Sequence, residues 1–269
     1  MIGIKMHTKL MGILNVTPDS FFDQGRWFDP QLAIERGKQI FLEGADILDI
    51  GGESTKPGAK PVSEKEELNR VIPVLQHLKA ELSIPISIDT MKVKVAEEAL
   101  KAGASLINDV SGFRDPFMRK LAVETRSSIC VMHMHETPTT MQNNPIYPTG
   151  VIPFLIEWFS KQIDLLLSEG VQEKQIILDP GIGFGKTVAD NVKIVQNLHK
   201  IKELGFPLLI GLSRKSFLGK IIHKSYPELL PSTLAANTLA ILAKVDILRV
   251  HDVAAHKDIL KVMQQFFST

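Results

Sequence analysis

Polar and charged side chains recur in this sequence where short apolar runs end. Asp89 and Asp179 are carboxylates that can accept pairs of N–H hydrogen bonds, and the Asn108 amide can both donate and accept. Arginine in the same setting can bind an anion through two parallel N–H bonds. The complete set comprises Asn15, Glu53, Asp89, Asn108, Asp179, Arg214 and Arg249. These residue types indicate a site for a small polar molecule.

Arg249 and His251 are the members of the strand-end region best suited to an anion. They are two residues apart, so on an extended strand both side chains lie on the same face. Arg249 can bind a phosphate group bidentately, and His251 can add a donor or supply a proton to a leaving group. A helix predicted to begin near Ala254 would direct its N-terminus at the same place. The alternative is a surface ion pair between Arg249 and Asp252 beside a solvated histidine.

The apolar runs that carry these residues have the composition of strands buried on both faces. They are almost wholly apolar and rich in β-branched residues, which is typical of a parallel sheet. Polar or glycine-rich residues follow each of them. The runs span residues 10–16, 46–51, 85–89, 106–110, 128–134, 176–179, 208–212 and 247–250.

Helical patterns with recognisable ends lie between the runs. Asp29 and Pro30 supply an N-cap and a proline at the first helical position. The segment from Ser63 to Glu66 has the composition of a capping box. Further helices are expected over 91–102, from 115 onward, and over 151–168, 189–204, 231–244 and 254–267.

Eight strand–helix alternations in 269 residues favour a closed (β/α)8 TIM barrel. An open, doubly wound sheet is the alternative, because alternation alone does not prove closure. We expect residues 1–269 to form a single domain, since no Pro/Gly/Ser-rich linker divides them. In a TIM barrel the active site lies at the C-terminal ends of the strands, which is where the polar set falls.

Composition narrows the possible partners and the compartment. The formal net charge is +1, so no overall field favours nucleic acid or a membrane surface, and an anionic substrate must be met by locally placed cations. No apolar run reaches the roughly 18 residues of a membrane span, and no cleavable signal pattern precedes residue 10. We therefore expect a cytoplasmic protein. The single cysteine, Cys130, is expected to be a buried core residue.

Eight motifs give the chain its resemblance to the dihydropteroate synthases. One motif follows each predicted strand, in order, from about residue 10 to residue 255. They are MGILNVTPDSF (11–21), DIGGESTKPGA (49–59), SIDT (87–90), INDVSG (107–112), MHM (132–134), DPGIGFGK (179–186), GLSRKS (211–216) and RVHD (249–252). Any one of them is moderate evidence, whereas the full ordered series is highly specific.

The resemblance implies a TIM barrel and a transferase reaction of folate biosynthesis. A dihydropterin carrying a CH2–diphosphate condenses with 4-aminobenzoate, giving dihydropteroate and diphosphate. The new C–N bond forms at the pterin methylene along an SN1-like path, and the cofactor implied is Mg2+. The implied partners are these two small molecules and, as a homodimer, a second copy of the chain.

The same resemblance assigns the pterin to the middle of the polar set. Asp89, Asn108 and Asp179 are expected to bind the ring together with Lys215. Lys215 and Asp89 are also expected to take part in catalysis, the carboxylates by stabilising a cationic pterin intermediate. Each strand-end polar group taken alone has an ordinary alternative, which is to hydrogen-bond a neighbouring loop.

By resemblance, the remaining site residues surround the diphosphate and the aminobenzoate. Arg249 and His251 are expected to bind the diphosphate and assist its departure as catalytic residues. Asn15 matches the magnesium position; one amide oxygen is a poor site alone, so the metal is expected only with the diphosphate. Ser216 is expected to reach the aminobenzoate carboxylate, and Phe184 to form an apolar wall.

The loop after the second predicted strand departs from the family pattern at one position. Thr55 and Pro57 match positions near the diphosphate and the aminobenzoate, but Lys56 stands where the family commonly has arginine. Lysine keeps the charge and loses the planar fork. The alternative for Lys56 is a solvated loop cation.

Two further motifs resemble known binding sites, a P-loop and a zinc site, but neither resemblance is favoured. Residues 181–187 look like a phosphate-binding P-loop, but Pro180 replaces the glycine that this motif requires. His133 and His135 could hold zinc from one face of a strand, although strand-end structure or loop contacts are favoured. At this point the family usually has MHMQG, whereas this chain has His135 and Glu136 after Met134.

Four competing functions follow from these features. A pterin-binding methyltransferase domain shares the barrel and the ring slot but needs no diphosphate site. A metal-dependent hydrolase would use His133 and His135, and a lyase would use Lys215 as a Schiff base. A non-catalytic homologue would bind pterin without turnover.

Overall fold

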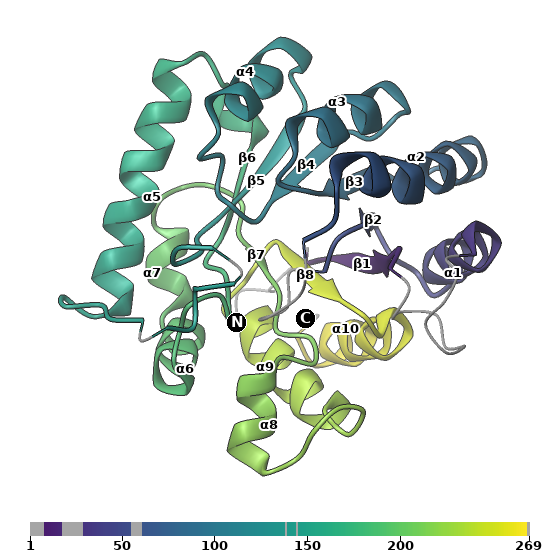
Figure 1. The fold of residues 1–269 in the computed structure, drawn as a ribbon. Coiled ribbons are helices and arrows are strands. Elements are labelled where there is room, and N and C mark those ends of the chain that lie inside the picture. The colour runs from purple at the N-terminus through teal and green to yellow at the C-terminus, as the bar shows by residue number, and fades with distance from the viewer. Residues whose placement is uncertain (1–7, 18–28, 55–60, 138, 144, 268–269) are drawn as a thin grey trace.

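The computed structural model describes residues 8–17, 29–54, 61–137, 139–143 and 145–267. These form a sheet of eight parallel strands in the order β6-β5-β4-β3-β2-β1-β8-β7, with helices arranged around the outside (Figure 1). The strands are β1 (Lys9–Asn15), β2 (Ile47–Gly51), β3 (Ile86–Asp89), β4 (Leu106–Asp109), β5 (Ser128–Met132), β6 (Ile176–Asp179), β7 (Leu209–Ile210) and β8 (Ile247–Val250).

The two ends of the strand order meet, which distinguishes a barrel from an open sheet. A parallel bridge joins Leu178 of β6 to Leu208, just before β7. The Leu178 amide donates to the Pro207 carbonyl at 2.9 Å. The predicted (β/α)8 barrel is therefore confirmed, and the doubly wound alternative is wrong.

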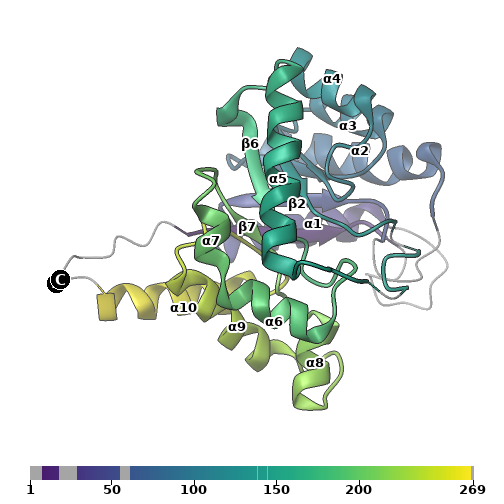
Figure 2. The ribbon, with the colours of Figure 1, turned by 90° about the vertical axis from the view of Figure 1, so that its left-hand side faces the viewer.

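The helices connect successive strands and cover the barrel. They are α1 (Pro30–Leu42), α2 (Glu64–Glu81), α3 (Val93–Lys101), α4 (Pro116–Thr125), α5 (Val151–Ser168), η2 (Glu173–Gln175), α6 (Val188–Gln196), α7 (Leu198–Lys202), α8 (Ser216–Ile222), α9 (Leu230–Leu242) and α10 (Val253–Phe267). The rotated view shows α5 lying across the outside of the strands, next to α6 and α7 (Figure 2). None of the helices that the structure describes is both long and apolar enough to span a bilayer.

The predicted helix ends match the structure in most places, with exceptions between α5 and α9. The helix expected over 189–204 is split at Asn197, whose side-chain amide donates to the Lys193 carbonyl at 2.8 Å, a local bond that competes with helical continuation. The short helix α8 was not predicted, because seven residues show too little periodicity. Ser63 caps α2 as expected, with its hydroxyl accepting from the Glu66 amide, while the Glu66 carboxylate contacts Arg70.

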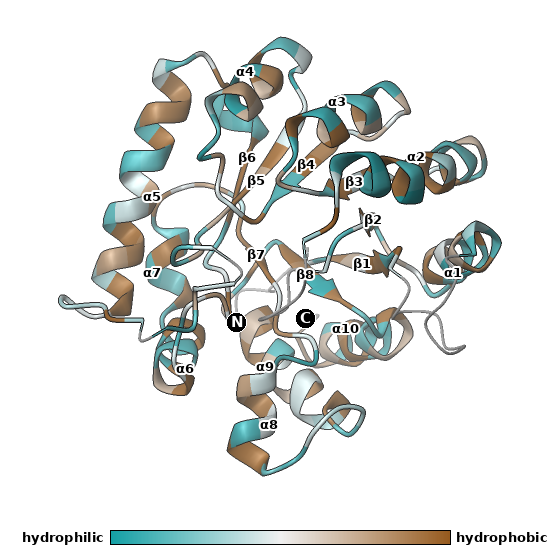
Figure 3. Ribbon diagram, viewed as in Figure 1, coloured by the Kyte–Doolittle hydropathy of each residue, from teal (hydrophilic) through white to brown (hydrophobic). Residues whose placement is uncertain are grey.

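Alternation along the strands divides the apolar core into two parts. Outward residues such as Leu48, Ile88 and Leu248 pack against the apolar faces of the helices, which Figure 3 shows as brown stripes. Inward residues fill the bottom of the barrel. This inner layer consists of Met11, Ile47, Leu106, Cys130, Leu209 and Ile247. Cys130 is buried, as predicted.

The register of the strands places the polar residues above that inner layer. Asp89 pairs with Asn108 across β3 and β4, and Asp179 lies opposite Met132 of β5. Arg249 pairs with Met11, so its side chain points inward one step above Ile247. The barrel thus brings polar groups from distant parts of the chain to one end.

Candidate active site

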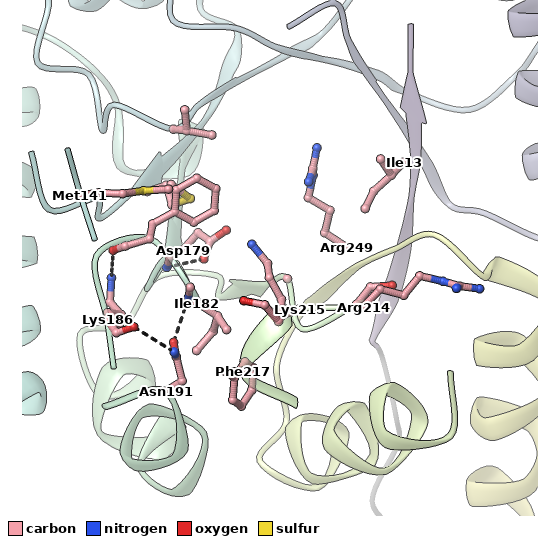
Figure 4. Close-up of a pocket in the computed structure, with 18 of the residues that line it drawn as sticks. Ile13, Met141, Asp179, Ile182, Lys186, Asn191, Arg214, Lys215, Phe217 and Arg249 are labelled. Atoms are coloured by element: carbon pink, nitrogen blue, oxygen red, sulfur yellow. Dashed lines mark hydrogen bonds between the residues drawn. The ribbon is translucent and has the colours of Figure 1, made fainter. Parts of the chain in front are cut away.

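A cavity of about 920 Å3 opens at the C-terminal ends of the strands. Its walls come from strands on opposite sides of the barrel and from the loops that follow them (Figure 4). Every predicted site residue that the structure describes lines this cavity: Asn15, Asp89, Asn108, Asp179, Phe184, Lys215, Ser216, Arg249 and His251. Thr55, Lys56 and Pro57 lie outside the described residues.

An arginine bound by two carboxylates forms the floor of the cavity. Arg249 donates from Nε to Oδ2 of Asp49 and from Nη2 to Oδ2 of Asp89, each at 2.6 Å. Burial disfavours the guanidinium charge, but Asp49 and Asp89 outweigh that effect and raise the pKa of Arg249. Arg249, the residue predicted to bind diphosphate, is thus already charged and held in place, and it faces the ring-binding residues.

Asp89 and Asn108 offer complementary hydrogen-bonding groups beside this arginine. Burial raises the pKa of Asp89 to about 7, against the opposing charge of Arg249. Asp89 is therefore divided between its acid and carboxylate forms near neutral pH. The Asn108 amide donates to Asp49 at 3.1 Å, while its Oδ1, buried, has no hydrogen-bond partner among the described residues. That oxygen remains available to accept from a ligand.

Asp179 lies across the cavity at the end of β6. Its Oδ1 accepts from the Gly181 amide at 2.7 Å, and burial raises the pKa of its carboxyl group against that hydrogen bond. Gly181 has φ +67°, and a Cβ there would lie 2.0 Å from the His133 carbonyl oxygen. Only glycine permits this tight turn, which fixes the direction of the Asp179 carboxylate.

Lys215 and Phe184 form the wall between Asp179 and Arg249. The Lys215 ammonium lies 4.3 Å from the centre of the Phe184 ring and points toward the space between Asp179 and Arg249 (Figure 4). Burial and the nearby Arg249 charge lower the pKa of Lys215 to about 8. Lys215 is therefore mostly charged at neutral pH and stands where it can donate to a bound ring.

His251 is a neutral hydrogen-bonding group in this cavity. Its Nδ1 lies 2.9 Å from the Ser213 hydroxyl, and burial and the Arg249 charge lower the pKa of its imidazole to about 3. The structure does not contain the surface ion pair considered for Arg249, because Asp252 instead pairs with Arg214, at 2.7 Å and 2.8 Å.

Comparison with known proteins matches this arrangement over nearly the whole chain. The sequence profile of a family described as "Pterin binding enzyme" matches residues 11–251. A dihydropteroate synthase of Synechocystis sp. is 49% identical over 257 residues, covering 95% of this chain and 89% of that protein.

The chain belongs to the pterin-binding enzyme family.

Solved structures agree with this assignment. The dihydropteroate synthase of Xanthomonas albilineans with 4-aminobenzoic acid has a TM-score of 0.91 and 39% identity, covering 98% of this chain and 94% of that one. The same enzyme in complex with 7,8-dihydropteroate has a TM-score of 0.89 and 38% identity, covering 98% of this chain and 95% of that one.

The oxygen donors of this pterin-binding site determine how the site could hold Mg2+. Among the described residues, no group of three or more His, Cys, Asp or Glu side chains is placed to hold a metal ion. Asn15 offers one neutral amide oxygen at the end of β1, and the neighbouring Glu53 carboxylate contacts Lys92. A hard oxygen donor of this kind suits Mg2+ when diphosphate and water supply the remaining ligands.

The two histidines after β5 do not form a zinc site. His133 is buried, and its Nδ1 lies 3.0 Å from the ammonium of Lys186. This contact occupies Nδ1 of His133 in the structure. The strand-end and loop contacts favoured for His133 over a zinc site are therefore present.

Sequence reasoning missed two groups of residues in this pterin-binding site. Asp49 begins the DIGGESTKPGA motif, and a charged residue within an otherwise apolar strand is a usable signal of a role in the site. Met132 and Met141 supply an apolar wall with Phe184. Met141 lies in a loop, and no pattern in the sequence distinguishes it from any other loop methionine.

Proposed function

We propose that this protein condenses (7,8-dihydropterin-6-yl)methyl diphosphate with 4-aminobenzoate, producing 7,8-dihydropteroate and diphosphate. The observation that carries the proposal is the shared cavity. Ring-recognising groups (Asp89, Asn108 and Asp179) and anion-binding groups (Arg249 and His251) open onto the same space. A methyltransferase domain would need the first set without the second.

The proposed ring site uses groups whose hydrogen-bonding capacity is open. The pterin edge alternates donors and acceptors. Asn108 presents an acceptor that lacks a partner among the described residues, and Asp179, which accepts from Gly181 through Oδ1, lines the same cavity. Asp89 can accept or donate, because its pKa is about 7. Lys215 would donate to the ring from the Phe184 side.

In the proposed reaction, the C–O bond between methylene and diphosphate breaks as electron density from the dihydropterin ring stabilises the methylene cation. Asp89 and Asp179 favour that cation, while Arg249 and His251 bind the departing diphosphate. The aminobenzoate nitrogen then forms the C–N bond and loses a proton to the departing diphosphate or to solvent. Bound Mg2+ would neutralise diphosphate charge, held to the protein by Asn15.

Burial of His251 determines how this residue can assist the leaving group. The His251 imidazole is neutral at pH 7, since its pKa is about 3. We therefore assign it the role of an N–H donor to diphosphate and expect the bound anion to raise its pKa. Ser213 orients the ring through Nδ1.

The test is a turnover assay with purified protein, the pterin diphosphate, 4-aminobenzoate and Mg2+, following diphosphate and dihydropteroate. We expect stoichiometric release of both. Absence of diphosphate release combined with tight binding of methyltetrahydrofolate would overturn the proposal in favour of the methyltransferase domain. Pterin binding without turnover would identify a non-catalytic homologue. Trapping by borohydride of a Schiff base between Lys215 and a carbonyl substrate would identify a lyase.

Replacing Asn15 by alanine is expected to weaken the affinity for Mg2+ without abolishing ring binding. The variant should need about tenfold more Mg2+ for half-maximal turnover, because one oxygen ligand is lost and water must replace it. Affinity for a pterin lacking diphosphate should stay unchanged. A magnesium dependence identical to that of the parent protein would remove Asn15 from the proposed metal site.

Replacing Lys56 by arginine tests the departure from the family pattern. Arginine restores a planar fork that can bind diphosphate bidentately, so we expect severalfold tighter binding of the pterin diphosphate. Calorimetric titration measures the change directly, with the diphosphate-free pterin as the control ligand. Unchanged or weaker affinity would refute the expectation.

Three broader proposals accompany the activity. We propose that residues 1–269 form one domain, and that the protein acts in the cytoplasm. We also propose a homodimer, supported by large apolar side chains exposed on adjacent helices, among them Leu239 and Phe266, which are 56% and 79% exposed. Light scattering at several concentrations tests the dimer.

A further inference from the structure

A buried lysine joins the loop between β6 and α6 to the end of β5. The Lys186 ammonium lies 3.0 Å from His133 Nδ1 and donates to the His133 carbonyl at 3.3 Å and the Phe184 carbonyl at 3.1 Å. Lys186 is only 4% exposed. These contacts connect the loop that carries Phe184 to a different strand of the barrel.

The histidine that receives this lysine is itself held rigidly. The His133 ring makes edge contacts with Trp158 at 5.0 Å and with Phe154 at 5.6 Å, both on α5. Its backbone amide continues the β5–β6 ladder by donating to the Asp179 carbonyl at 3.0 Å. His133 is therefore a fixed point against which Lys186 can hold the loop.

Other side chains also bond the backbone of this loop: Gln142 donates to the Gly183 carbonyl and Tyr147 to the Gly185 carbonyl, each at 2.6 Å, whereas Lys186 reaches the Phe184 carbonyl. Gly181, Gly183 and Gly185 all have positive φ and contribute no side chain. Asn191 accepts from the Gly183 amide at 2.9 Å, as Figure 4 shows beside Lys186. Because glycine leaves the backbone many accessible conformations, side-chain contacts must select the one that the cavity uses.

A buried ammonium is a costly way to hold a loop. The contacts of the Lys186 ammonium among the described residues are to His133 and to the Phe184 carbonyl, not to a carboxylate, and burial lowers the pKa of this group to about 7. Methionine of similar length would avoid that penalty and would not provide the three hydrogen bonds. Such a cost is typical of residues retained for a site's geometry.

The position of Phe184 indicates what this geometry serves. The strand ends supply the polar groups for the pterin edge, whereas Phe184 presents an aromatic face across the cavity under Lys215. We propose that Lys186, through its contacts with His133, is a positioning residue. It places Phe184 where this side chain forms the wall for the aromatic ring of 4-aminobenzoate. This inference rests on the proposed function.

The test compares binding of the two substrates in matched variants. Lys186→Met removes the contacts with His133, and Lys193→Met removes an exposed lysine of α6 as the control. For Lys186→Met we expect the KM for 4-aminobenzoate to rise at least about tenfold, while the Kd for the pterin diphosphate stays within about threefold. Lys193→Met should leave both constants unchanged.

Two substitutions of His133 give an independent test if Lys186→Met does not fold. His133→Asn retains an acceptor for the ammonium and should largely preserve the KM for 4-aminobenzoate. His133→Leu removes the acceptor and should raise that KM as Lys186→Met does, and the double variant should be no worse than the poorer single one.

The outcomes separate this inference from the proposed function. If the parent protein turns over and the Lys186 and His133 variants leave the KM for 4-aminobenzoate unchanged, the positioning role is wrong. Equal losses in pterin and aminobenzoate binding would also overturn it, since they would indicate general damage. Absence of turnover in the parent protein would instead overturn the proposed function.

Discussion

Replacement of Arg249 by methionine is expected to lower kcat/KM by at least about 10^3-fold, because two effects combine. The variant loses the cationic contact proposed for diphosphate. It also leaves the carboxylates of Asp49 and Asp89 without their shared cation, which changes the floor against which the pterin would bind. Steady-state assays with both substrates varied would measure the loss.

The same substitution is expected to reduce stability in a pH-dependent way. Removing one partner from a buried ion pair typically costs about 3–5 kcal/mol. Without Arg249 the pKa of Asp89 should rise further above 7, so the native state binds a proton that the unfolded state does not. The loss of unfolding free energy should therefore be smaller at acidic pH than at alkaline pH.

Two controls accompany the Arg249 variant. Arg249→Lys keeps the charge but not the fork, and we expect activity between those of the parent and the methionine variant. Arg119→Met removes an arginine that pairs with Glu169 outside the cavity and should leave turnover unchanged. A methionine variant that retained a tenth of the parent activity would contradict the assignment of Arg249.

Replacing Asp89 by asparagine is expected to separate activity from stability. Turnover should fall by about 10^2–10^4-fold, because the cation-stabilising charge and one ring contact are lost. The unfolding free energy at pH 8 should increase, on the order of 1 kcal/mol, because asparagine removes a buried charge. Asp49 would still pair with Arg249 in this variant.

The sign of the stability effect follows from the direction of the pKa change. The pKa of Asp89 is 3.8 in its ordinary state and about 7 in the folded protein. Between these values the native state binds the extra proton, so this group makes the protein less stable as pH rises through that window. Its penalty is complete above pH 7 and absent below about pH 4. The advantage of Asp89→Asn should therefore shrink as pH falls.

Urea unfolding at several pH values would check this expectation. Asp258→Asn, an exposed change on α10, is the matched control and should show no pH-dependent difference. An Asp89→Asn variant less stable than the parent at pH 8 would show that the carboxylate contributes more through Arg249 than it loses by burial.

The barrel and the identity of the strand-end residues could be predicted from the sequence because both depend on local order. Apolar runs of strand length alternate with capped helical segments, and one motif follows each run. Once parallel strands close into a barrel, their C-terminal ends must share one rim. Asp89, Asn108, Asp179 and Arg249 were therefore expected together, and they line one cavity.

Only the tertiary structure decided which partners these residues take and what charge they carry. Asp49 and Arg249 are 200 residues apart in sequence, yet they share a hydrogen bond at the barrel floor. The contact of Lys186 with His133 likewise joins two loops that no local pattern relates. Ion pairing and burial depend on distances in space and on exclusion of water, and neither is encoded in the spacing of residues along the chain.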